Sequence, residues 1–299
     1  MFNSYDEIFK AAKQNGKKKM SVACAADENV LKACYKASEI GIVEAVLTGN
    51  KNDIHKILDK LGIKKDYFKI IDSKNDSEAI LNAVELVSTN ECKFILKGYT
   101  QSSDFLKGVL NKEKGLRTGK LLSHTAVIEM KKYKRIVQLT DGGMNIYPDI
   151  ASKIQILQNA IDLANHMDIK RPKVAVLGPV EVVNLDIQEN LDAAVFSKMA
   201  QRKQFGNCVI EGPLAMDLIL SKESAKHKKI DNEVCGQADI ILVPNLVSGN
   251  AIVKTMVYMA EIELGGLILG AKAPCLLLSR ADTMKTKLNS IALGNVITN

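Results

Sequence analysis

Short apolar runs alternate with amphipathic stretches along this sequence, and that alternation limits its possible folds more than any other feature. In the first hundred residues the strand-like runs lie at 20–25, 42–47, 68–71 and 93–96. Helical patterns lie at 6–15, 52–61 and 77–87, and a further one follows 27–29 and ends near residue 41. Strands that alternate with helices build βαβ units around a mainly parallel sheet. The sequence therefore predicts an α/β fold.

The same alternation continues in the rest of the chain. We expect strands at 126–130, 135–140, 174–177, 207–210 and 238–243, and helices at 149–167, 191–203, 251–264 and 284–294. A helix or turn is expected at 121–124, Pro213 fits the first turn of a helix, and the glycine-rich stretch 265–270 is expected to be a connection. A chain of 299 residues exceeds the usual size of one small core, which favours two domains.

The composition argues against several classes of protein. The six cysteines form no Cys-x-x-Cys pair and the four histidines have no ligand spacing, so we expect reduced thiols and no metal. No Gly-x-Gly-x-x-Gly follows the first strand, and no Walker lysine is present. The net charge of +7 is spread along the chain and aromatic residues make up 5%, so we expect no nucleic-acid partner. No apolar run is long enough to cross a bilayer, so we expect no membrane partner and a cytoplasmic location.

The stretch 274–283, PCLLLSRADT, is the strongest candidate for a reaction site. Its apolar run stops abruptly at polar residues, as a buried strand does when it delivers them to its carboxyl end, where open α/β sheets place their chemistry. Ser279 can donate a hydrogen bond, Arg280 can hold an oxyanion or a phosphate, and Asp282 can accept a proton. Together these groups suit acyl or phosphoryl transfer. The alternative, in which Ser279 or Asp282 caps a helix and Arg280 is a surface charge, fits the spacing equally well.

Two segments near residue 100 offer groups for an anion. Ser102 lies in a small, hydroxylic stretch before a helix, where backbone N–H groups and the helix dipole favour negative charge. A serine-capped helix is the alternative. Arg117 lies in the basic, glycine-containing loop 114–120, which could meet the phosphates of an anionic ligand. Taken alone, a solvated loop explains this segment better.

Two further polar turns follow buried strands. Asp141 and Asn145 lie after strand 135–140 in a turn with paired glycines, which suits either the close approach of a ligand or a simple Asx turn. Asn245, Ser248 and Asn250 form a glycine-containing turn before a helix, an arrangement that favours an anion. We expect the second turn to contribute to a binding site.

Together, these segments resemble the phosphate acetyltransferase and phosphate butyryltransferase family. Leu278-Ser279-Arg280 after a buried strand looks like the family's active-site signature, and the resemblance extends over 97–148 and 209–250. Three details favour the butyryltransferase branch: GLRTGKLLSH at 115–124, DGGMN at 141–145, and SRAD at 279–282, where acetyltransferases usually carry Gly-Cys after the arginine.

The resemblance implies two α/β/α domains with a cleft between them, similar in fold to isocitrate and isopropylmalate dehydrogenases. We expect the first domain to comprise 1–138 and 275–299, and the second 139–274. The implied reaction moves an acyl group, butyryl by preference, between coenzyme A and inorganic phosphate, with coenzyme A as a substrate and no cofactor. A homo-oligomer is also expected. A phosphate acetyltransferase, an NAD-linked dehydrogenase on the same fold and a non-catalytic coenzyme A-binding protein are the alternatives.

The resemblance also implies roles for individual residues. Arg280 would hold phosphate, and Ser279 would hydrogen-bond to the sulfur or the carbonyl oxygen of the thioester. Lys107 matches a basic active-site residue of the acetyltransferases. The family's aspartate, seven residues after the serine, is replaced here by Thr286. Asp282 is the nearest carboxylate and is the expected substitute base.

Overall fold

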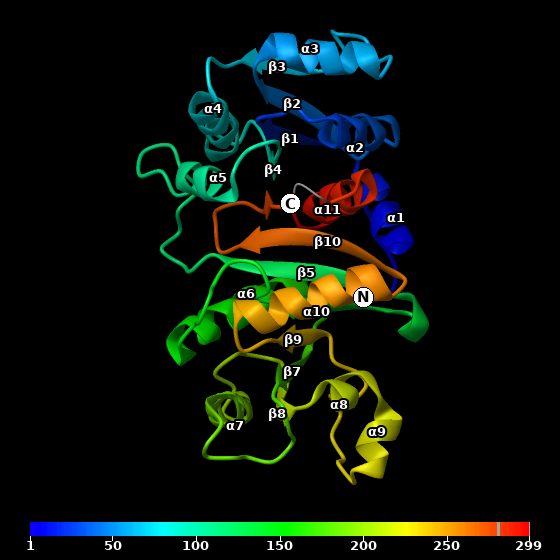
Figure 1. Cartoon of the computed structure of the whole chain (residues 1–299), viewed down its shortest axis with the longest axis vertical. Helices are drawn as coiled ribbons and strands as arrows, with labels where there is room; N and C mark the ends of the chain where they lie inside the picture. Colours follow the sequence, from blue (N-terminus) through cyan, green and yellow to red (C-terminus); the bar gives the residue numbers. More distant parts are fainter. Residues whose placement is uncertain (280–281, 299) are drawn as a thin grey trace. The chain divides into compact units, whose positions relative to one another are not determined.

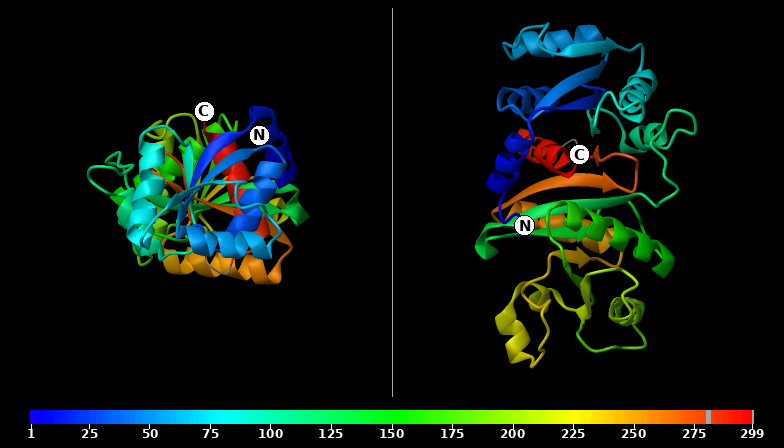
Figure 2. Two further views of the ribbon diagram at one scale, coloured as in Figure 1. Left: turned by 90° about the horizontal axis from the view of Figure 1, so that it is seen from above. Right: turned by 180° about the vertical axis from the view of Figure 1, so that it is seen from behind.

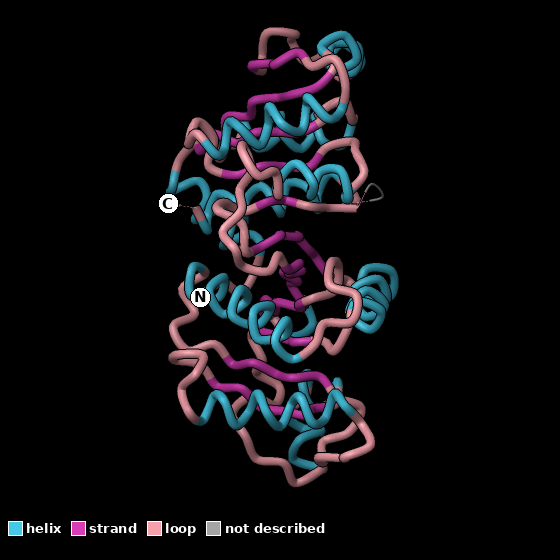
Figure 3. The backbone as a smooth tube through the Cα atoms, turned by 90° about the vertical axis from the view of Figure 1, so that its left-hand side faces the viewer, coloured by secondary structure: helices cyan, strands magenta, loops and turns pink. Residues whose placement is uncertain are grey.

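The computed structural model describes residues 1–279 and 282–298, which form two compact units. We name them by their order in the sequence. The flanking unit is made of 5–120 and 264–299, and the central unit is made of 1–4 and 121–263. Each unit combines a sheet with helices, so the predicted α/β class is confirmed. The alternation of strand and helix within each unit can be followed along the backbone in Figure 3.

The flanking unit begins with a helix, continues with four βα repeats and is completed by the C-terminal segment. Its elements, in chain order, are α1 (Tyr5–Asn15), β1 (Lys18–Ala23), α2 (Glu28–Glu39), β2 (Val43–Gly49), α3 (Lys51–Lys60), β3 (Lys69–Asp72), α4 (Asp76–Ser88), β4 (Phe94–Lys97), α5 (Ser102–Val109), β10 (Ile262–Leu269), β11 (Cys275–Leu276) and α11 (Met284–Ile297). The side chains of Asp27, Asn50 and Asn75 each accept a hydrogen bond from the first turn of the helix that follows.

The strand order in the flanking unit is β3-β2-β1-β4-β11-β10. All these strands pair in parallel except β10, which is antiparallel to β11. Helices α4 and α5 lie on one face, and α1, α2 and α11 lie on the other (Figures 1 and 2). Because β11 runs parallel to β4, with Leu276 opposite Leu96, the segments after both strands leave the sheet at the same edge.

The central unit begins with a hairpin and continues with parallel strands. Its elements are β5 (Ser123–Met130), η1 (Lys131–Tyr133), β6 (Arg135–Thr140), α6 (Ile150–His166), β7 (Lys173–Leu177), α7 (Gln188–Gln201), β8 (Val209–Leu214), α8 (Met216–Leu220), α9 (Lys222–His227), β9 (Ile240–Leu242) and α10 (Leu246–Met259). The strand order is β5-β6-β9-β7-β8, and only β5 with β6 is antiparallel. Buried side chains of α6 and α7, including Leu157 and Phe196, pack on β7, β8 and β9 to form the core.

Several predictions of local structure are wrong. Residues 121–124 form no helix, because β5 begins at Ser123 and the amide of Asn159 holds O of Leu121 and Oγ of Ser123, both at 3.0 Å. Pro213 lies within β8, the edge strand, beside an irregularity in its register with β7, where a missing N–H is tolerated. The stretch 265–270 belongs mostly to strand β10.

The units change over at 120/121 and 263/264. The hairpin of β5 and β6 pairs from Thr125 opposite Thr140 to Met130 opposite Arg135, and both strands belong to the central unit. The division into domains of 1–138 with 275–299 and of 139–274 stays a prediction. In the described part of the chain, no helix has the length and apolar character that a membrane span requires.

Candidate active site

Hydrogen bonds between Ser279 and Asp282 close the turn after β11. The N–H of Ser279 donates to Oδ2 of Asp282 (2.7 Å), and the N–H of Asp282 donates to O of Ser279 (3.1 Å). Ser279 is exposed, and Arg280 lies outside the described residues. Asp282 therefore helps to hold the turn in which Ser279 lies. Thr286 lies in the first turn of α11, where its N–H donates to Oγ1 of Thr283 (3.2 Å).

A small cavity of about 10 Å³ lies beside Ser279, in the flanking unit. Its lining residues are Asp27, Val30, Lys97, Gly98, Tyr99, Leu278, Ser279 and Lys287. Two of them are lysines that are each only 4% exposed. Lys97 ends β4 and its Nζ donates to O of Thr100 (2.9 Å), while Nζ of Lys287 donates to O of Asp282 (2.8 Å). The turn at Ser279 thus lies next to two buried cationic side chains.

Burial lowers the pKa of Lys287, because the low-dielectric surroundings disfavour the charged form. The nearby carboxylates of Asp27 and Asp282 act in the opposite direction. Asp27 also caps α2, since its Oδ1 accepts the N–H of Val30 (2.9 Å). The cavity therefore contains a titratable group whose proton is held less tightly than in an ordinary lysine.

Gly98 positions the cavity wall. A Cβ at this residue would lie 2.2 Å from O of Cys24, so only glycine allows the end of β4 to approach the end of β1 so closely. The N–H groups of Gly98 and Tyr99 donate to O of Ala23 and O of Cys24, both at 2.8 Å. These contacts fix the backbone from which Lys97 and Tyr99 project.

The other predicted residues of the flanking unit lie on its surface. Ser102 is exposed and begins α5, and Gln101 before it makes no side-chain capping bond. Lys107, in the last turn of α5, pairs with Asp104 at 3.0 Å, with 77% of its side chain exposed. Arg117 is exposed in a loop that is tied to the rest of the unit by the bond from N–H of Lys272 to O of Leu116 (2.8 Å). All three could meet an anion that arrives from solvent.

In the central unit, Asp141 organises the loop after β6. It is 2% exposed and accepts hydrogen bonds from several neighbours. The donors are the N–H groups of His124 (3.1 Å), Gly143 (2.8 Å), Met144 (2.9 Å) and Asn145 (3.3 Å), and Nδ2 of Asn145 (2.6 Å). The carboxylate of Asp141 is therefore engaged in shaping its own loop. Nδ2 of Asn145 also donates to O of Leu122 (2.9 Å).

The loop at Asp141 packs against the start of α10. Asn245 caps this helix, since its Oδ1 accepts the N–H of Ser248 (3.0 Å), and Ser248 and Asn250 lie inside the helix rather than in a preceding turn. Nδ2 of Asn250 donates to O of Gly142 (3.4 Å). A Cβ on Gly249 would lie 2.7 Å from Cα of Gly142, so glycine is required by close packing at this point. The structure thus brings together the five predicted residues of the central unit.

Comparison with known proteins identifies the family. The family model described as phosphate acetyl/butaryl transferase matches residues 76–294, a range that includes both the loop at Asp141 and the turn at Ser279. The chain belongs to this family. The resemblance inferred from the sequence is confirmed.

Individual members of the phosphate acetyl/butaryl transferase family are similar over almost the whole chain. Phosphate butyryltransferase of Clostridium acetobutylicum is 44% identical and covers 99% of this chain, which covers 99% of it. Phosphate acetyltransferase of Thermotoga maritima is 38% identical over 97% of this chain and 98% of its own. The crystal structure of a branched-chain phosphotransacylase from Enterococcus faecalis has a TM-score of 0.85 at 28% identity, covering 94% of this chain and 100% of that one.

Two residues of this family member's candidate site, Lys97 and Lys287, escaped the sequence analysis. Lys97 ends the strand Phe94–Lys97 after three apolar residues. A lysine in such a position is normally exposed, and nothing in the sequence distinguishes an exposed lysine from a buried one. Lys287 lies on a helix that the sequence predicts, but its burial depends on how α11 packs against α2 and α1. The sequence itself shows only that no charged residue follows Lys287 in this helix, which does not by itself indicate that Lys287 is buried.

The cysteines near the site are poorly suited to act as nucleophiles. Burial raises the pKa of the thiols of Cys24 and Cys275 to about 12, so the reactive thiolate is scarce at neutral pH. Among the described residues, no three histidine, cysteine or acidic side chains gather as metal ligands would. The raised pKa values argue against Cys24 or Cys275 as the nucleophile of an acyl-enzyme.

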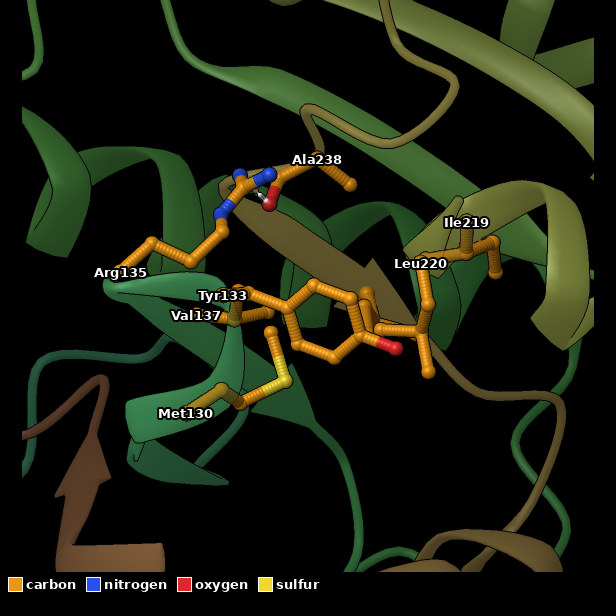
Figure 4. A pocket seen from close by; sticks show the side chains of 8 residues that line it. Met130, Tyr133, Arg135, Val137, Ile219, Leu220 and Ala238 are labelled. Atoms are coloured by element: carbon orange, nitrogen blue, oxygen red, sulfur yellow. Dashed lines mark hydrogen bonds between the residues drawn. The ribbon is translucent and has the colours of Figure 1, made fainter. Parts of the chain in front are cut away.

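Two other hollows are less suited to a substrate phosphate. A cavity of about 510 Å³ at the ends of β1 and β2 is lined by Asp53 and Asp76, whose negative charge opposes that of a phosphate, with Lys56 as the cationic lining residue. The hollow shown in Figure 4 is lined by Met130, Tyr133 and Leu220, and the guanidinium of Arg135 is occupied by O of Ala238 and O of Gly236. Arg135 is therefore a structural residue.

Proposed function

We propose that this protein transfers a short acyl group, butyryl by preference, between coenzyme A and inorganic phosphate: butanoyl-CoA + phosphate = butanoyl phosphate + CoA. The observation that supports this most is the turn at Ser279 beside a cavity with two buried lysines, in a chain 44% identical to a phosphate butyryltransferase. Coenzyme A is then a substrate, and the reaction needs no other cofactor. Because coenzyme A thioesters are metabolites of the cytoplasm, the proposal places the enzyme there.

The reaction begins when a phosphate oxygen attacks the thioester carbonyl. Negative charge develops on the carbonyl oxygen, and the sulfur of coenzyme A leaves. Arg280 holds the phosphate and neutralises the developing charge, and Ser279 donates a hydrogen bond to the carbonyl oxygen or the sulfur. The sequence suggests Asp282 as the base toward the thiol of coenzyme A. Its bond to the N–H of Ser279 also supports a second role, the positioning of Ser279.

The remaining candidate residues act in binding. Ser102, Lys107 and Arg117 are exposed polar or cationic groups that suit the phosphates of coenzyme A or the free phosphate. The sequence suggests that five polar residues of the central unit bind substrate. In the structure the polar groups of these residues form hydrogen bonds within the protein. These residues, Asp141, Asn145, Asn245, Ser248 and Asn250, are proposed to shape the loop that meets the substrate.

An assay of thiol release tests the proposal and its acetyltransferase alternative. Butyryl-CoA and acetyl-CoA are each supplied with and without phosphate, and free coenzyme A is measured. We expect release that requires phosphate, with a larger kcat/KM for butyryl-CoA. A larger kcat/KM for acetyl-CoA would favour the alternative, a phosphate acetyltransferase. The 38% identity to such an enzyme is the reason to test this alternative. Release that does not require phosphate would contradict the proposal.

We also propose that the enzyme is a homo-oligomer in which a second copy covers α10. This helix is apolar, yet Gly249 is its only buried residue, and Tyr258 and Met259 are 79% and 83% exposed. Ile146 and Tyr147 continue the apolar surface, since O of Ile146 accepts the N–H of Leu246. The exposed apolar area is on the order of several hundred Å², approaching the roughly 800 Å² per partner of specific interfaces. Lys254 is the single charged residue of α10, which argues against a lipid surface, because interfacial helices carry many basic residues.

Substitution of the exposed end of α10 tests this assembly. The double variant Tyr258→Glu with Met259→Glu should dissociate into monomers, because charged side chains oppose burial in an apolar interface. The matched control is Leu185→Glu, at a residue that is 78% exposed elsewhere in the central unit. Light scattering after gel filtration measures the mass. A monomeric wild-type protein, or a double variant of unchanged mass, would contradict the proposed interface.

A further inference from the structure

The departing sulfur of coenzyme A needs a proton. The two positions expected to transfer this proton are occupied by a threonine and by an aspartate that already accepts a hydrogen bond. Thr286 stands where the family resemblance implies an aspartate, and a threonine hydroxyl is no base at neutral pH. Asp282 uses Oδ2 to accept the N–H of Ser279 at 2.7 Å. Another titratable group beside Ser279 could perform the transfer.

Lys287 is such a group, because its ammonium is buried and has more donors than hydrogen bonds to the residues that the structure describes. Within the described part of the chain, Nζ makes one hydrogen bond, to O of Asp282 (2.8 Å), although an ammonium carries three donors. The residue is 4% exposed, so bulk water reaches it poorly, and unmet donors in such a place are costly. Lys287 and Ser279 both line the cavity of about 10 Å³, which has room for about one water molecule.

We propose that Lys287, rather than Asp282, is the proton donor and acceptor for the thiol of coenzyme A, acting through one water molecule in the cavity beside Ser279. Asp282 then has only the role of positioning Ser279. This inference rests on the proposed acyl transfer. A general acid or base can act on its partner across a single water molecule. The bond from Nζ to O of Asp282 fixes the direction from which the ammonium approaches the turn.

The proposed step balances protons and electrons. A phosphate oxygen forms a bond to the acyl carbon, the carbon–sulfur bond breaks, and its electron pair passes to sulfur. The Lys287 ammonium gives a proton through the water to sulfur, which leaves as the thiol. Lys287 then regains a proton from the hydroxyl of the transferred phosphate, so the net movement is one proton from phosphate to sulfur. In reverse, neutral Lys287 removes the thiol proton.

The charged groups around Lys287 agree with this role. Asp27 faces it from the start of α2, Asp282 from the turn before α11, and Lys97 and Tyr99 from the end of β4. Burial lowers the pKa of Lys287 below that of an ordinary lysine, which brings the group closer to the operating pH of a general acid or base. The carboxylates of Asp27 and Asp282 act in the opposite direction and favour the protonated form of Lys287.

The pH dependence of turnover in both directions tests the proposal. In the wild type, acyl-CoA consumption needs protonated Lys287, so kcat falls on the alkaline side. Acyl-CoA formation needs neutral Lys287, so kcat falls on the acid side. Lys287→Met keeps the approximate length of the side chain and removes its charge. We expect kcat to fall by about a hundredfold, and both the alkaline fall and the acid fall of kcat to disappear. Lys287→Arg keeps the charge and a donor for O of Asp282 but cannot release a proton, so its rate should stay low.

Controls separate this role from a structural one. Lys285→Met removes an exposed lysine on the same helix and should leave both profiles unchanged. Circular dichroism and the melting temperature report whether each variant folds, and Lys287→Arg decides the question if the methionine variant does not. Retention of both falls of kcat in Lys287→Met, or wild-type rates in Lys287→Arg, would overturn the assignment while the acyl transfer stands. Absence of phosphate-dependent coenzyme A release in the wild type would instead overturn the proposed function and the role of Lys287 with it.

Discussion

Replacing Arg280 by alanine is expected to lower the rate of phosphate-dependent coenzyme A release by at least about a hundredfold with the fold intact. A guanidinium can hold phosphate through two parallel hydrogen bonds and can stabilise the charge that develops during attack. Removal of one such stabilising group typically costs on the order of 3 kcal/mol in the transition state. Initial rates with butyryl-CoA over a range of phosphate concentrations measure both kcat and the KM for phosphate.

Two further variants make the result specific to this position. Arg280→Lys keeps the charge and loses the planar fork, so an intermediate rate is expected. Arg202→Ala removes an exposed arginine at the end of α7 and should leave the rate unchanged. A loss of less than about tenfold in Arg280→Ala would place the chemistry elsewhere in the protein.

The second large effect is expected on stability, in Asp141→Ala. This substitution removes the buried acceptor of four backbone N–H groups, those of His124, Gly143, Met144 and Asn145. Hydrogen bonds to a charged acceptor contribute about 1.5 to 3 kcal/mol each. Because the donor residues are exposed or only partly buried, water replaces part of what is lost, and the free energy of unfolding should fall by about 3 to 5 kcal/mol. Urea denaturation, followed by circular dichroism, measures the change.

The matched control for Asp141 is Asp217→Ala. Oδ2 of Asp217 pairs with Lys228 at 3.2 Å and its side chain is 48% exposed, so a change within about 1 kcal/mol is expected. If Asp141→Ala unfolds at the same urea concentration as the wild type, the hydrogen bonds around this carboxylate do not stabilise the loop.

The elements that the sequence predicts best are those whose burial is uniform. The parallel strands β2 and β7 are apolar throughout most of their length, and polar caps such as Asn75 mark where helices begin. Strand β10 was missed because Gly265 and Gly266 suggest a turn. In the structure Gly265 leaves room for two buried side chains, since a Cβ would lie 2.8 Å from Cδ1 of Leu293 and from Oη of Tyr5. Contacts between residues so distant in the sequence leave no local pattern.

The candidate site shows the same limit. The sequence predicts that Ser279 directly follows a strand. In the structure β11 already ends at Leu276, so Ser279 lies beyond the strand, in the turn that its hydrogen bond to Asp282 closes. The burial of Lys97 and Lys287 follows from tertiary packing and not from either residue's neighbours in the chain. Asn245 and Ser248 were expected to offer groups to an anion, and the structure shows them hydrogen-bonded to each other at the start of α10. The polar character of a turn therefore predicts its location better than the partners of its side chains.

The most direct test of the central claim is to identify the product by phosphorus-31 NMR after incubation of the protein with butyryl-CoA and phosphate. The account predicts a new acyl phosphate resonance that grows in proportion to the coenzyme A released and disappears when coenzyme A is added in excess. Release of coenzyme A with butyrate and unchanged phosphate as the products would contradict it, because the protein would then be a hydrolase.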